Sequence, residues 1–373
     1  MTDFSARTAA LTAEPSRDDA HDPARLARVG RTREEMLRQG AAVSDTLARE
    51  AGAVRALAGR IAGRGIERVV IAGCGDSWFC GAGVRHAWEL LLGWPTEAAQ
   101  ALDYACYGAA AADRRTLVLG LSSGGNTPAV MKALAAARAR GAMTVGVSNT
   151  AGSPVLAESE AGLVVHATRK GWPTQSSTAT MALLAAVAVA VADALGRDAA
   201  ALRDELARLP NLLDAVAAGH DAAMRAAAED FAAAQLVLFT GLGPNGAAAS
   251  FGAAKLRELS PIHAVAQPLE EMHHYRAQKR GDPLLLIATD PASRERALDT
   301  VLVSAARGGR TVALLAAPDA EIAARAERTV ILPAVHPALA ALVSSVPLHL
   351  FAFHFATARD ALGLGYPGAF PGT

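Results

Sequence analysis

The sequence predicts an α/β protein of two tandem doubly wound domains, each a parallel sheet with helices on both faces. The chain has 373 residues, and at roughly 150 residues per domain this length suggests two domains. In both halves, short apolar runs alternate with longer Ala-rich segments, as in parallel strands joined by helices. A strand ending in closely spaced glycines opens each half. We therefore expect ligands to bind beyond the carboxyl ends of the strands.

The first domain is expected to span residues 31–205. Residues 1–30 mix Thr, Asp, Pro and Ala without an apolar period and are expected to form a flexible tail. Residues 32–62 have the spacing of an amphipathic helix. A β-branched run from Arg68 into a glycine turn predicts a buried strand. Further strands are expected at 117–121, 143–147 and 163–166, with a helix at 128–140.

The second domain, expected at residues 206–373, repeats this order. Residues 202–228, which contain Pro210, are expected to be a helical linker. A strand at 236–240 leads through a second glycine turn into a helix ending near residue 259. Later strands are expected at 284–288, 311–315 and 329–332, followed by an apolar helix at 338–358 in which His349 and His354 would be core residues.

Composition excludes several classes of protein. Apolar residues make up 51% of the chain and charged residues 19%, which excludes wholesale disorder. Lys plus Arg and Asp plus Glu both total 36, so nothing favours binding of nucleic acid in general. The apolar run 181–192 is shorter than the roughly 20 residues of a membrane span. With no signal peptide and no CxxC pair among Cys74, Cys80 and Cys106, we expect a cytoplasmic protein that does not bind membranes.

The segment Leu121-Ser-Ser-Gly-Gly-Asn-Thr127 is the most informative motif of the first half. It leaves a predicted strand and opens a predicted helix, where backbone N–H groups and the helix dipole favour an anion. Ser122, Ser123 and Thr127 would complete such a cradle. The simpler alternative is that Asn126 or Thr127 only caps the helix.

The glycine turns themselves are less specific. Gly73-Cys-Gly-Asp-Ser77 and Gly241-Leu-Gly243 could be tight turns alone. Neither is a complete GxGxxG motif, and no acidic residue is placed to bind a ribose, which argues against a dinucleotide cofactor.

In the second half, Lys255 and Glu258 share one face of a predicted helix, and a surface ion pair is the simplest interpretation. The adjacent His273 and His274 would diverge in an extended segment and have no HExxH partner, which argues against a metal site. We expect neither a metal nor an organic cofactor.

Together these residues resemble the sugar isomerase (SIS) domain family. The resemblance rests on Gly75-Asp-Ser77, on Ser122-Ser-Gly-Gly-Asn-Thr127, and on Glu258 followed sixteen residues later by His274. It runs from about Glu34 to the end of the chain. The family includes the isomerase half of glucosamine-6-phosphate synthase, amino-sugar-phosphate deaminase/isomerases and fructosamine-6-phosphate deglycases. The resemblance implies that Ser77, Ser122, Ser123 and Thr127 bind a sugar phosphate.

The resemblance also implies the catalytic roles. Glu258 would be the general base and His274 the group that opens the sugar ring or acts as an acid. The chemistry needs a further group to stabilise an enediolate, for which Lys255 is available. The sequence departs from the family pattern at Gly124, which lacks a hydroxyl, at Phe251, and at Tyr275-Arg276.

The expected function is that of a phosphosugar isomerase or deaminase acting on a hexose or amino-hexose 6-phosphate. The reaction would abstract a proton between C1 and C2 and pass through an enediol or enediolamine. A fructosamine-6-phosphate deglycase and a non-catalytic phosphosugar-binding regulator remain alternatives. The resemblance and the apolar helix at 338–358 further predict a homodimer with shared active sites, in which His274 serves the partner's Glu258.

Overall fold

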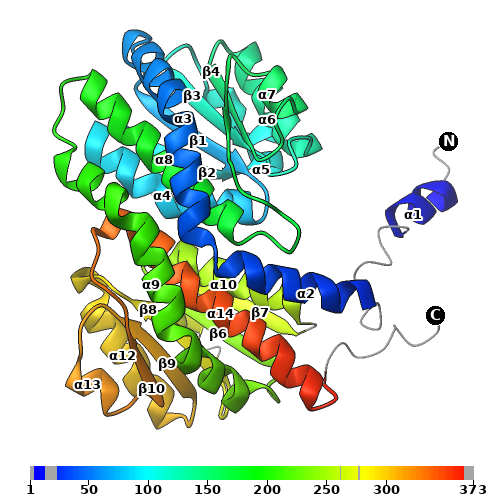
Figure 1. The fold of residues 1–373 in the computed structure, drawn as a ribbon, viewed down its shortest axis with the longest axis vertical. Coiled ribbons are helices and arrows are strands. Elements are labelled where there is room, and N and C mark those ends of the chain that lie inside the picture. The colour runs from blue at the N-terminus through cyan, green and yellow to red at the C-terminus, as the bar shows by residue number, and fades with distance from the viewer. Residues whose placement is uncertain (1–3, 13–22, 261, 276–277, 365–373) are drawn as a thin grey trace.

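The structure, a computed structural model, describes residues 4–12, 23–260, 262–275 and 278–364. Figure 1 shows two α/β domains stacked along the long axis of the molecule. Each contains a five-stranded parallel sheet, with strand orders β2-β1-β3-β4-β5 and β10-β9-β8-β6-β7. Read from the other edge, the second order repeats the first, since β6 and β7 correspond to β1 and β2. The expected pair of doubly wound α/β domains is confirmed.

The first domain follows the predicted order, with one additional strand and several additional short helices. The strands are β1 (Arg68–Gly73), β2 (Thr96–Gln100), β3 (Thr116–Leu121), β4 (Met143–Ser148) and β5 (Ala161–Val164). The helices are α3 (Gln39–Gly63), α4 (Asp76–Leu92), α5 (Ala101–Cys106), α6 (Pro128–Ala139), α7 (Pro154–Ala157) and α8 (Gln175–Ala194), with a 3₁₀ turn at Gly108–Ala111. Both β1 and β3 are buried along almost their whole length, because helices cover both faces of a parallel sheet.

The second domain repeats the plan after the long helix α9 (Ala200–Phe231), which is the helical region expected at 202–228. Its strands are β6 (Leu236–Gly241), β7 (His263–Pro268), β8 (Pro283–Ala288), β9 (Arg310–Leu315) and β10 (Arg328–Ile331). Its helices are α10 (Pro244–Leu259), α11 (Glu271–Tyr275), α12 (Arg294–Ala306), α13 (Ala320–Ala323) and α14 (Ala340–Ala361), with 3₁₀ turns at Pro291–Ser293 and Pro337–Leu339.

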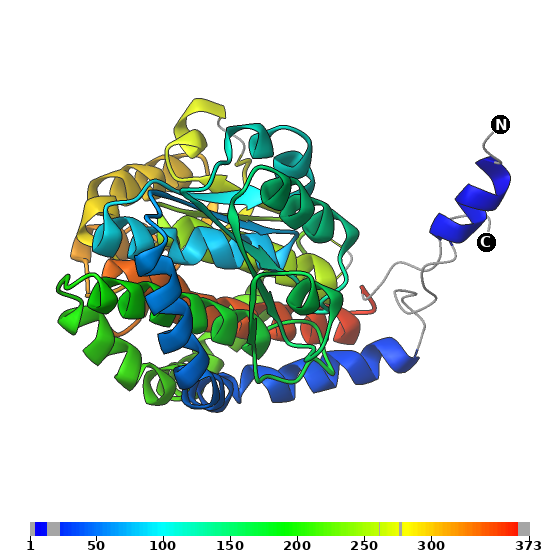
Figure 2. The same cartoon turned by 90° about the horizontal axis from the view of Figure 1, so that it is seen from above.

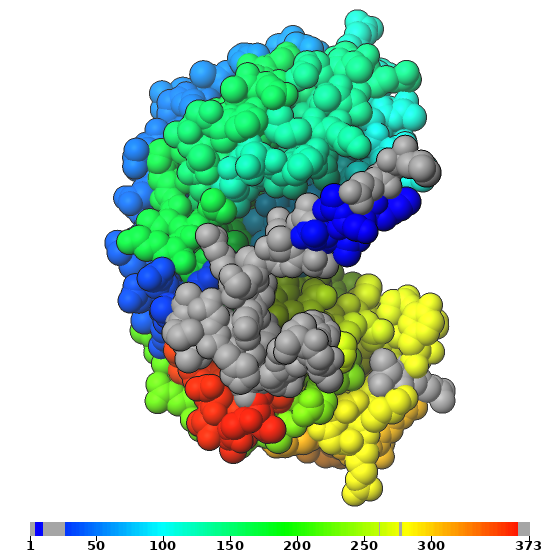
Figure 3. Space-filling model, turned by 90° about the vertical axis from the view of Figure 1, so that its right-hand side faces the viewer, coloured from blue at the N-terminus to red at the C-terminus, as the bar shows by residue number. Residues whose placement is uncertain are grey.

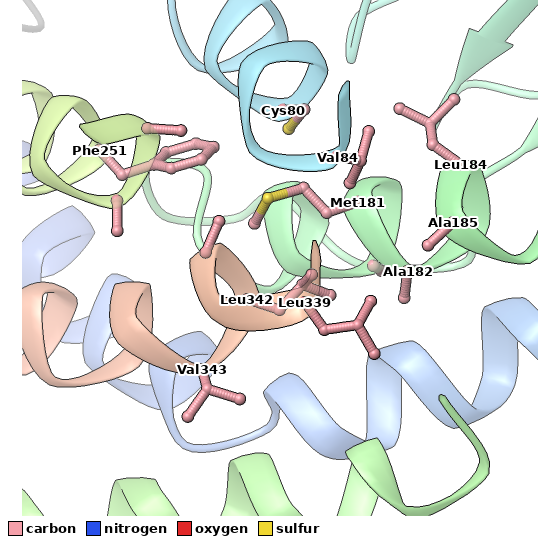
Figure 4. Packing of buried hydrophobic residues seen from close by; sticks show 14 of the residues in the cluster. Cys80, Val84, Met181, Ala182, Leu184, Ala185, Phe251, Leu339, Leu342 and Val343 are labelled. Carbon is pink, nitrogen blue, oxygen red and sulfur yellow. The ribbon is translucent and has the colours of Figure 1, made fainter. Parts of the chain in front are cut away.

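One hydrophobic core joins the two domains. Cys80 and Val84 of α4 meet Met181 of α8, Phe251 of α10 and Leu342 of α14 in a single buried cluster (Figure 4). Helix α8 and residues 337–361 are long and apolar enough to cross a membrane, but 72% and 94% of their apolar windows are buried inside the protein. Both are core helices here, which agrees with the buried helix expected at 181–192.

The structure differs from the sequence predictions near the N-terminus and at two strands. Helix α1 (Phe4–Thr12) lies within the expected tail, and helix α2 (Pro23–Met36) begins within it and ends beyond it. Residues 1–3 and 13–22 of the expected tail lie outside the described residues. The helix expected at 32–62 is two helices. Strands β2 and β7 were missed, because both are edge strands with mixed exposure and no continuous apolar run.

Helix α2 is held to the rest of the protein by specific contacts. Val29 and Met36 are buried, and Arg33 forms an ion pair of 2.8 Å with Asp221 of α9. Figures 1 and 2 show α2 running alongside α14. In the space-filling view of Figure 3 the molecule is hollowed between its two halves.

Candidate functional site

A cavity of about 310 Å³ lies at the carboxyl ends of β1, β3 and β4. The turn after β1 and the Ser122–Thr127 segment after β3 form one wall, and Glu258 of α10 contributes from the second domain. In the strand order β2-β1-β3-β4-β5, connections leave β1 and β3 in opposite directions. The cavity thus occupies the switch point at which ligands bind in doubly wound folds.

The segment after β3 is shaped by its own hydroxyl groups. The Ser122 hydroxyl lies 2.9 Å from the Thr127 hydroxyl and accepts a hydrogen bond of 3.0 Å from the backbone N–H of Gly125. Gly125 has a φ of 78°, a conformation that favours glycine. The Ser123 hydroxyl donates to Asn149 Oδ1 at 2.9 Å. All three hydroxyl-bearing residues predicted for phosphate binding here line the cavity.

The helix-cap alternative is not what the structure shows. Thr127 is the N-cap residue of α6, but its side chain makes no capping hydrogen bond and pairs with Ser122 instead. Pro128 at the start of α6 has no N–H group, and the N–H of Val130 already donates to the Thr127 carbonyl at 3.0 Å. The hydroxyl groups of the segment, rather than the first N–H groups of α6, are therefore the donors available to an anion at this wall of the cavity.

The turn after β1 contributes a second helix N-terminus. Gly75 has a φ of 54° and is the N-cap residue of α4, which places Asp76 and Ser77 in the first turn of that helix. Ser77, predicted to bind phosphate, lines the cavity, as does Asp76.

Lys255 connects the two domains by its charge. Its ammonium group is fully buried and donates to Asp76 Oδ2 at 2.8 Å and to Glu258 Oε2 at 2.5 Å. The interpretation of Lys255 and Glu258 as a surface pair was therefore wrong. Asp76 belongs to the first domain and the other two residues to the second, so this Asp76–Lys255–Glu258 cluster joins the two walls of the cavity.

The cluster shifts the pKa values of Lys255 and Glu258, its two residues on α10. Burial disfavours the charged form of Lys255, but Asp76 and Glu258 outweigh it and raise its pKa above the usual value. Burial raises the pKa of Glu258, and the charge of Asp76 raises it further, while Lys255 opposes both. The side chain of Glu258 is still 32% exposed. A carboxylate that reaches the cavity with a raised pKa is suited to accept a proton from a ligand.

His349 lies behind this cluster in the core. It is fully buried beside Phe251, and burial together with the charge of Lys255 lowers its pKa to about 3. Neither ring nitrogen has a hydrogen-bond partner among the described residues. His354 is buried too and lies 2.7 Å from Asp221. Both histidines are core residues, as the sequence predicts.

The structure does not bring His274 into the cavity of its own chain. His273 and His274 lie on the short helix α11, not in an extended segment as expected. The imidazole of His274 is 63% exposed and lies 3.3 Å from Glu270. Of the predicted site residues, Ser77, Ser122, Ser123, Thr127 and Glu258 line one cavity, Lys255 contacts it through Glu258, and His274 stands apart.

Several lining residues were missed from the sequence. Asp76 stands inside the quoted glycine turn, and a carboxylate at the start of a helix could have been singled out. Arg169 and Asn149 follow strands but belong to no motif, while Ser176 and Ser177 open the apolar helix α8. Among the described residues, no group of three or more His, Cys, Asp or Glu could hold a metal ion.

Comparison with known proteins extends the resemblance to sequence and fold. The SIS domain family matches residues 64–190 and 230–359. Glutamine–fructose-6-phosphate aminotransferase (isomerizing) of Thermus thermophilus is 34% identical over 301 residues, which are 79% of this chain and 50% of that protein. The chain spans about half the length of the curated relatives it matches.

Solved structures share the fold at lower identity. The C-terminal domain of glucosamine-fructose-6-phosphate aminotransferase from Francisella tularensis superposes with a TM-score of 0.77 at 21% identity, over 88% of this chain and 96% of that one. Glucosamine-6-phosphate deaminase from Thermotoga maritima superposes with a TM-score of 0.67 at 18% identity, over 91% and 97%. At these identities the likeness establishes the fold.

Proposed function

The chain belongs to the SIS domain family, and we propose that it is a phosphosugar isomerase or deaminase with its active site in the cavity between the two domains. One observation carries the proposal. The hydroxyl-lined segment after β3 and the Glu258 carboxylate face the same cavity of about 310 Å³ from different domains. This arrangement suits a substrate with a phosphate at one end and an acidic C–H group at the other.

The first step is binding of the phosphate. Ser77, Ser122, Ser123 and Thr127 offer hydroxyl groups, and the N-terminus of α4 offers backbone N–H groups. Contacts with the phosphate hold the whole sugar in place, so that C1 and C2, which are remote from the phosphate, lie against Glu258.

Glu258 then acts as the general base. It takes the proton from the carbon next to the carbonyl, the C–H electrons form the C1=C2 double bond, and the carbonyl π electrons move onto oxygen. Proton transfer to that oxygen gives the enediol or enediolamine. Return of the proton to the neighbouring carbon, with loss of the hydroxyl proton from the other oxygen to form the new carbonyl, completes an aldose–ketose isomerisation. Lys255, held by Asp76 and Glu258, keeps Glu258 in place and supplies positive charge near the developing oxyanion.

The charge of the Asp76–Lys255–Glu258 cluster favours an amino sugar. Two carboxylates flank one ammonium group, and the partly exposed Glu258 carboxylate presents an anionic acceptor at this end of the cavity when it is ionised. A protonated amine on C1 or C2 would be attracted there, whereas a neutral hydroxyl would gain only a hydrogen bond. We therefore favour an amino-hexose 6-phosphate over a plain hexose 6-phosphate, with a fructosamine-6-phosphate deglycase as the related alternative.

His274 enters the proposal through the partner subunit. In a symmetric dimer the exposed His274 of one protomer would reach the cavity of the other and open the sugar ring. This role requires the homodimer that the sequence resemblance predicts.

The experiment that tests the function is proton exchange in D₂O, followed by NMR. Wild-type protein is incubated with glucosamine 6-phosphate, fructose 6-phosphate and glucose 6-phosphate, and the C1 and C2 protons are monitored. We expect exchange on at least one of them, lost in Glu258→Gln. Binding without exchange on any of them would overturn the enzymatic proposal in favour of a phosphosugar-binding regulator.

A further inference from the structure

The cavity contains one cation that neither the motifs nor the proposed mechanism uses. Arg169 is the only Lys or Arg among the described residues that line it, and it forms no ion pair with any described residue. Its two terminal nitrogens lie 3.8 and 3.9 Å from the position that a Cβ atom on Gly124 would occupy. The guanidinium group therefore lies directly beside the Ser122–Thr127 segment.

The backbone around Arg169 is held in place from both sides. The buried carboxylate of Glu35 on α2 accepts hydrogen bonds from the Thr168 hydroxyl at 2.7 Å and from the backbone N–H of Lys170 at 2.8 Å. It accepts a third from the N–H of Gly171 at 3.2 Å. These bonds fix the chain on either side of Arg169, whose own side chain lines the cavity.

The cavity needs a positive charge at this point. A phosphate monoester carries about −1.5 to −2 charges at pH 7, while the other charged lining residues, Asp76 and Glu258, are acidic. Hydroxyl and backbone N–H groups hydrogen-bond a phosphate but do not neutralise it. A guanidinium group supplies a full charge and a planar pair of donors that matches two phosphate oxygens.

The lack of a side chain at Gly124 lets a bound phosphate lie close to both the backbone and Arg169. This residue has no side chain between the segment and Arg169, so a bound phosphate can contact the backbone and the guanidinium group together. A Cβ at position 124 would meet Asn126 Oδ1 at 3.4 Å, so the space is open but narrow.

We propose that Arg169 is a phosphate-binding residue, positioned by Glu35, that completes the phosphate site beside the Ser122–Thr127 segment. This inference rests on the proposed function, since it assigns the phosphate end of the same cavity. It makes charge at residue 169, rather than the hydroxyl groups alone, the determinant of selectivity for phosphorylated over unphosphorylated sugars.

The test is calorimetric titration of the full chain with inorganic phosphate, fructose 6-phosphate and fructose. Arg169→Gln removes the charge, Arg169→Lys keeps the charge without the planar fork, and Lys170→Gln removes a neighbouring charge that does not line the cavity. For both phosphate ligands, Arg169→Gln should weaken binding about 10- to 100-fold, as expected for loss of a charged hydrogen-bonding group. Arg169→Lys should recover part of that loss, and Lys170→Gln should bind like the wild type.

Each further outcome has a separate meaning. The role of Arg169 is overturned, and the proposed function is not, by either of two results. One is that Arg169→Gln binds phosphate within about twofold of the wild type. The other is that Lys170→Gln loses as much phosphate affinity as Arg169→Gln. Wild type that binds none of the phosphate ligands overturns both this inference and the proposed function. Arg169-dependent binding without any proton exchange keeps the phosphate site and overturns only the enzymatic activity.

Discussion

Replacing Asp76 by Asn separates a structural role for the Asp76–Lys255–Glu258 cluster from a catalytic one. At 2.8 Å and an effective dielectric constant of about 20, the gross attraction between Asp76 and the Lys255 ammonium is about 6 kcal/mol. Most of this is offset by the desolvation of both groups, and the amide oxygen of the Asp76→Asn variant can still accept a hydrogen bond. We expect a net loss of roughly 1–3 kcal/mol in the free energy of unfolding, measured in urea.

The same substitution should move the pH dependence of activity in a defined direction. The charge of Asp76 helps to raise the pKa of Glu258, so its removal should lower that pKa. A general base works only when deprotonated, so the acidic limb of the profile of kcat/KM against pH should move to lower pH. Asp103→Asn, on the exposed start of α5, is the matched control and should leave the limb in place. An acidic limb that stays put or moves upward in Asp76→Asn would refute the reasoning, even if the protein were destabilised.

Two further predictions concern histidines. His349 has a pKa of about 3 in the folded state against 6.5 for a free imidazole, so its contribution to stability is complete above pH 6.5 and is lost as the pH falls toward 3. Between about pH 8 and pH 5 it should account for about 2 kcal/mol of the fall in unfolding free energy, and urea unfolding of His349→Leu should lack this part; an unchanged pH dependence would contradict it. If His274 serves the partner's Glu258, mixing His274→Ala with Glu258→Gln protomers should restore about a quarter of the wild-type activity, because about half the dimers would carry one intact site. A monomer in sedimentation velocity, or no recovery on mixing, would count against the shared site.

Much of the fold follows from local patterns. Strands such as β3 and β8 are buried along their whole length, so they appear in the sequence as continuous apolar runs bounded by turns. The edge strands β2 and β7 give no such signal, because one side of each is open and their residues are mixed. Residues 23–31 of α2 were missed because Leu26 and Val29 are the only large apolar side chains there, and the helix is held by tertiary contacts such as the ion pair of Arg33 with Asp221.

In the candidate site, too, residues with a local sequence signal were predicted, and features that depend on long-range contacts were not. Ser122 and Thr127 were predictable because one short segment carries both the strand end and the helix start. Lys255 was found, but its burial was not, since its partner Asp76 is 179 residues away in the chain. Arg169 has no local motif at all. Its place depends on Glu35 of α2, which lies far away in the sequence, and such long-range pairing cannot be derived from spacing.

The most direct test of the central claim is deuterium exchange at C1 and C2 of a hexose or amino-hexose 6-phosphate. The account predicts that the wild type exchanges one of these protons with solvent. Glu258→Gln should exchange it on the order of 10²–10⁴ times more slowly while still binding the phosphosugar, because the phosphate-binding residues lie in the other domain. Exchange at the wild-type rate in Glu258→Gln would contradict the assignment of Glu258 as the base.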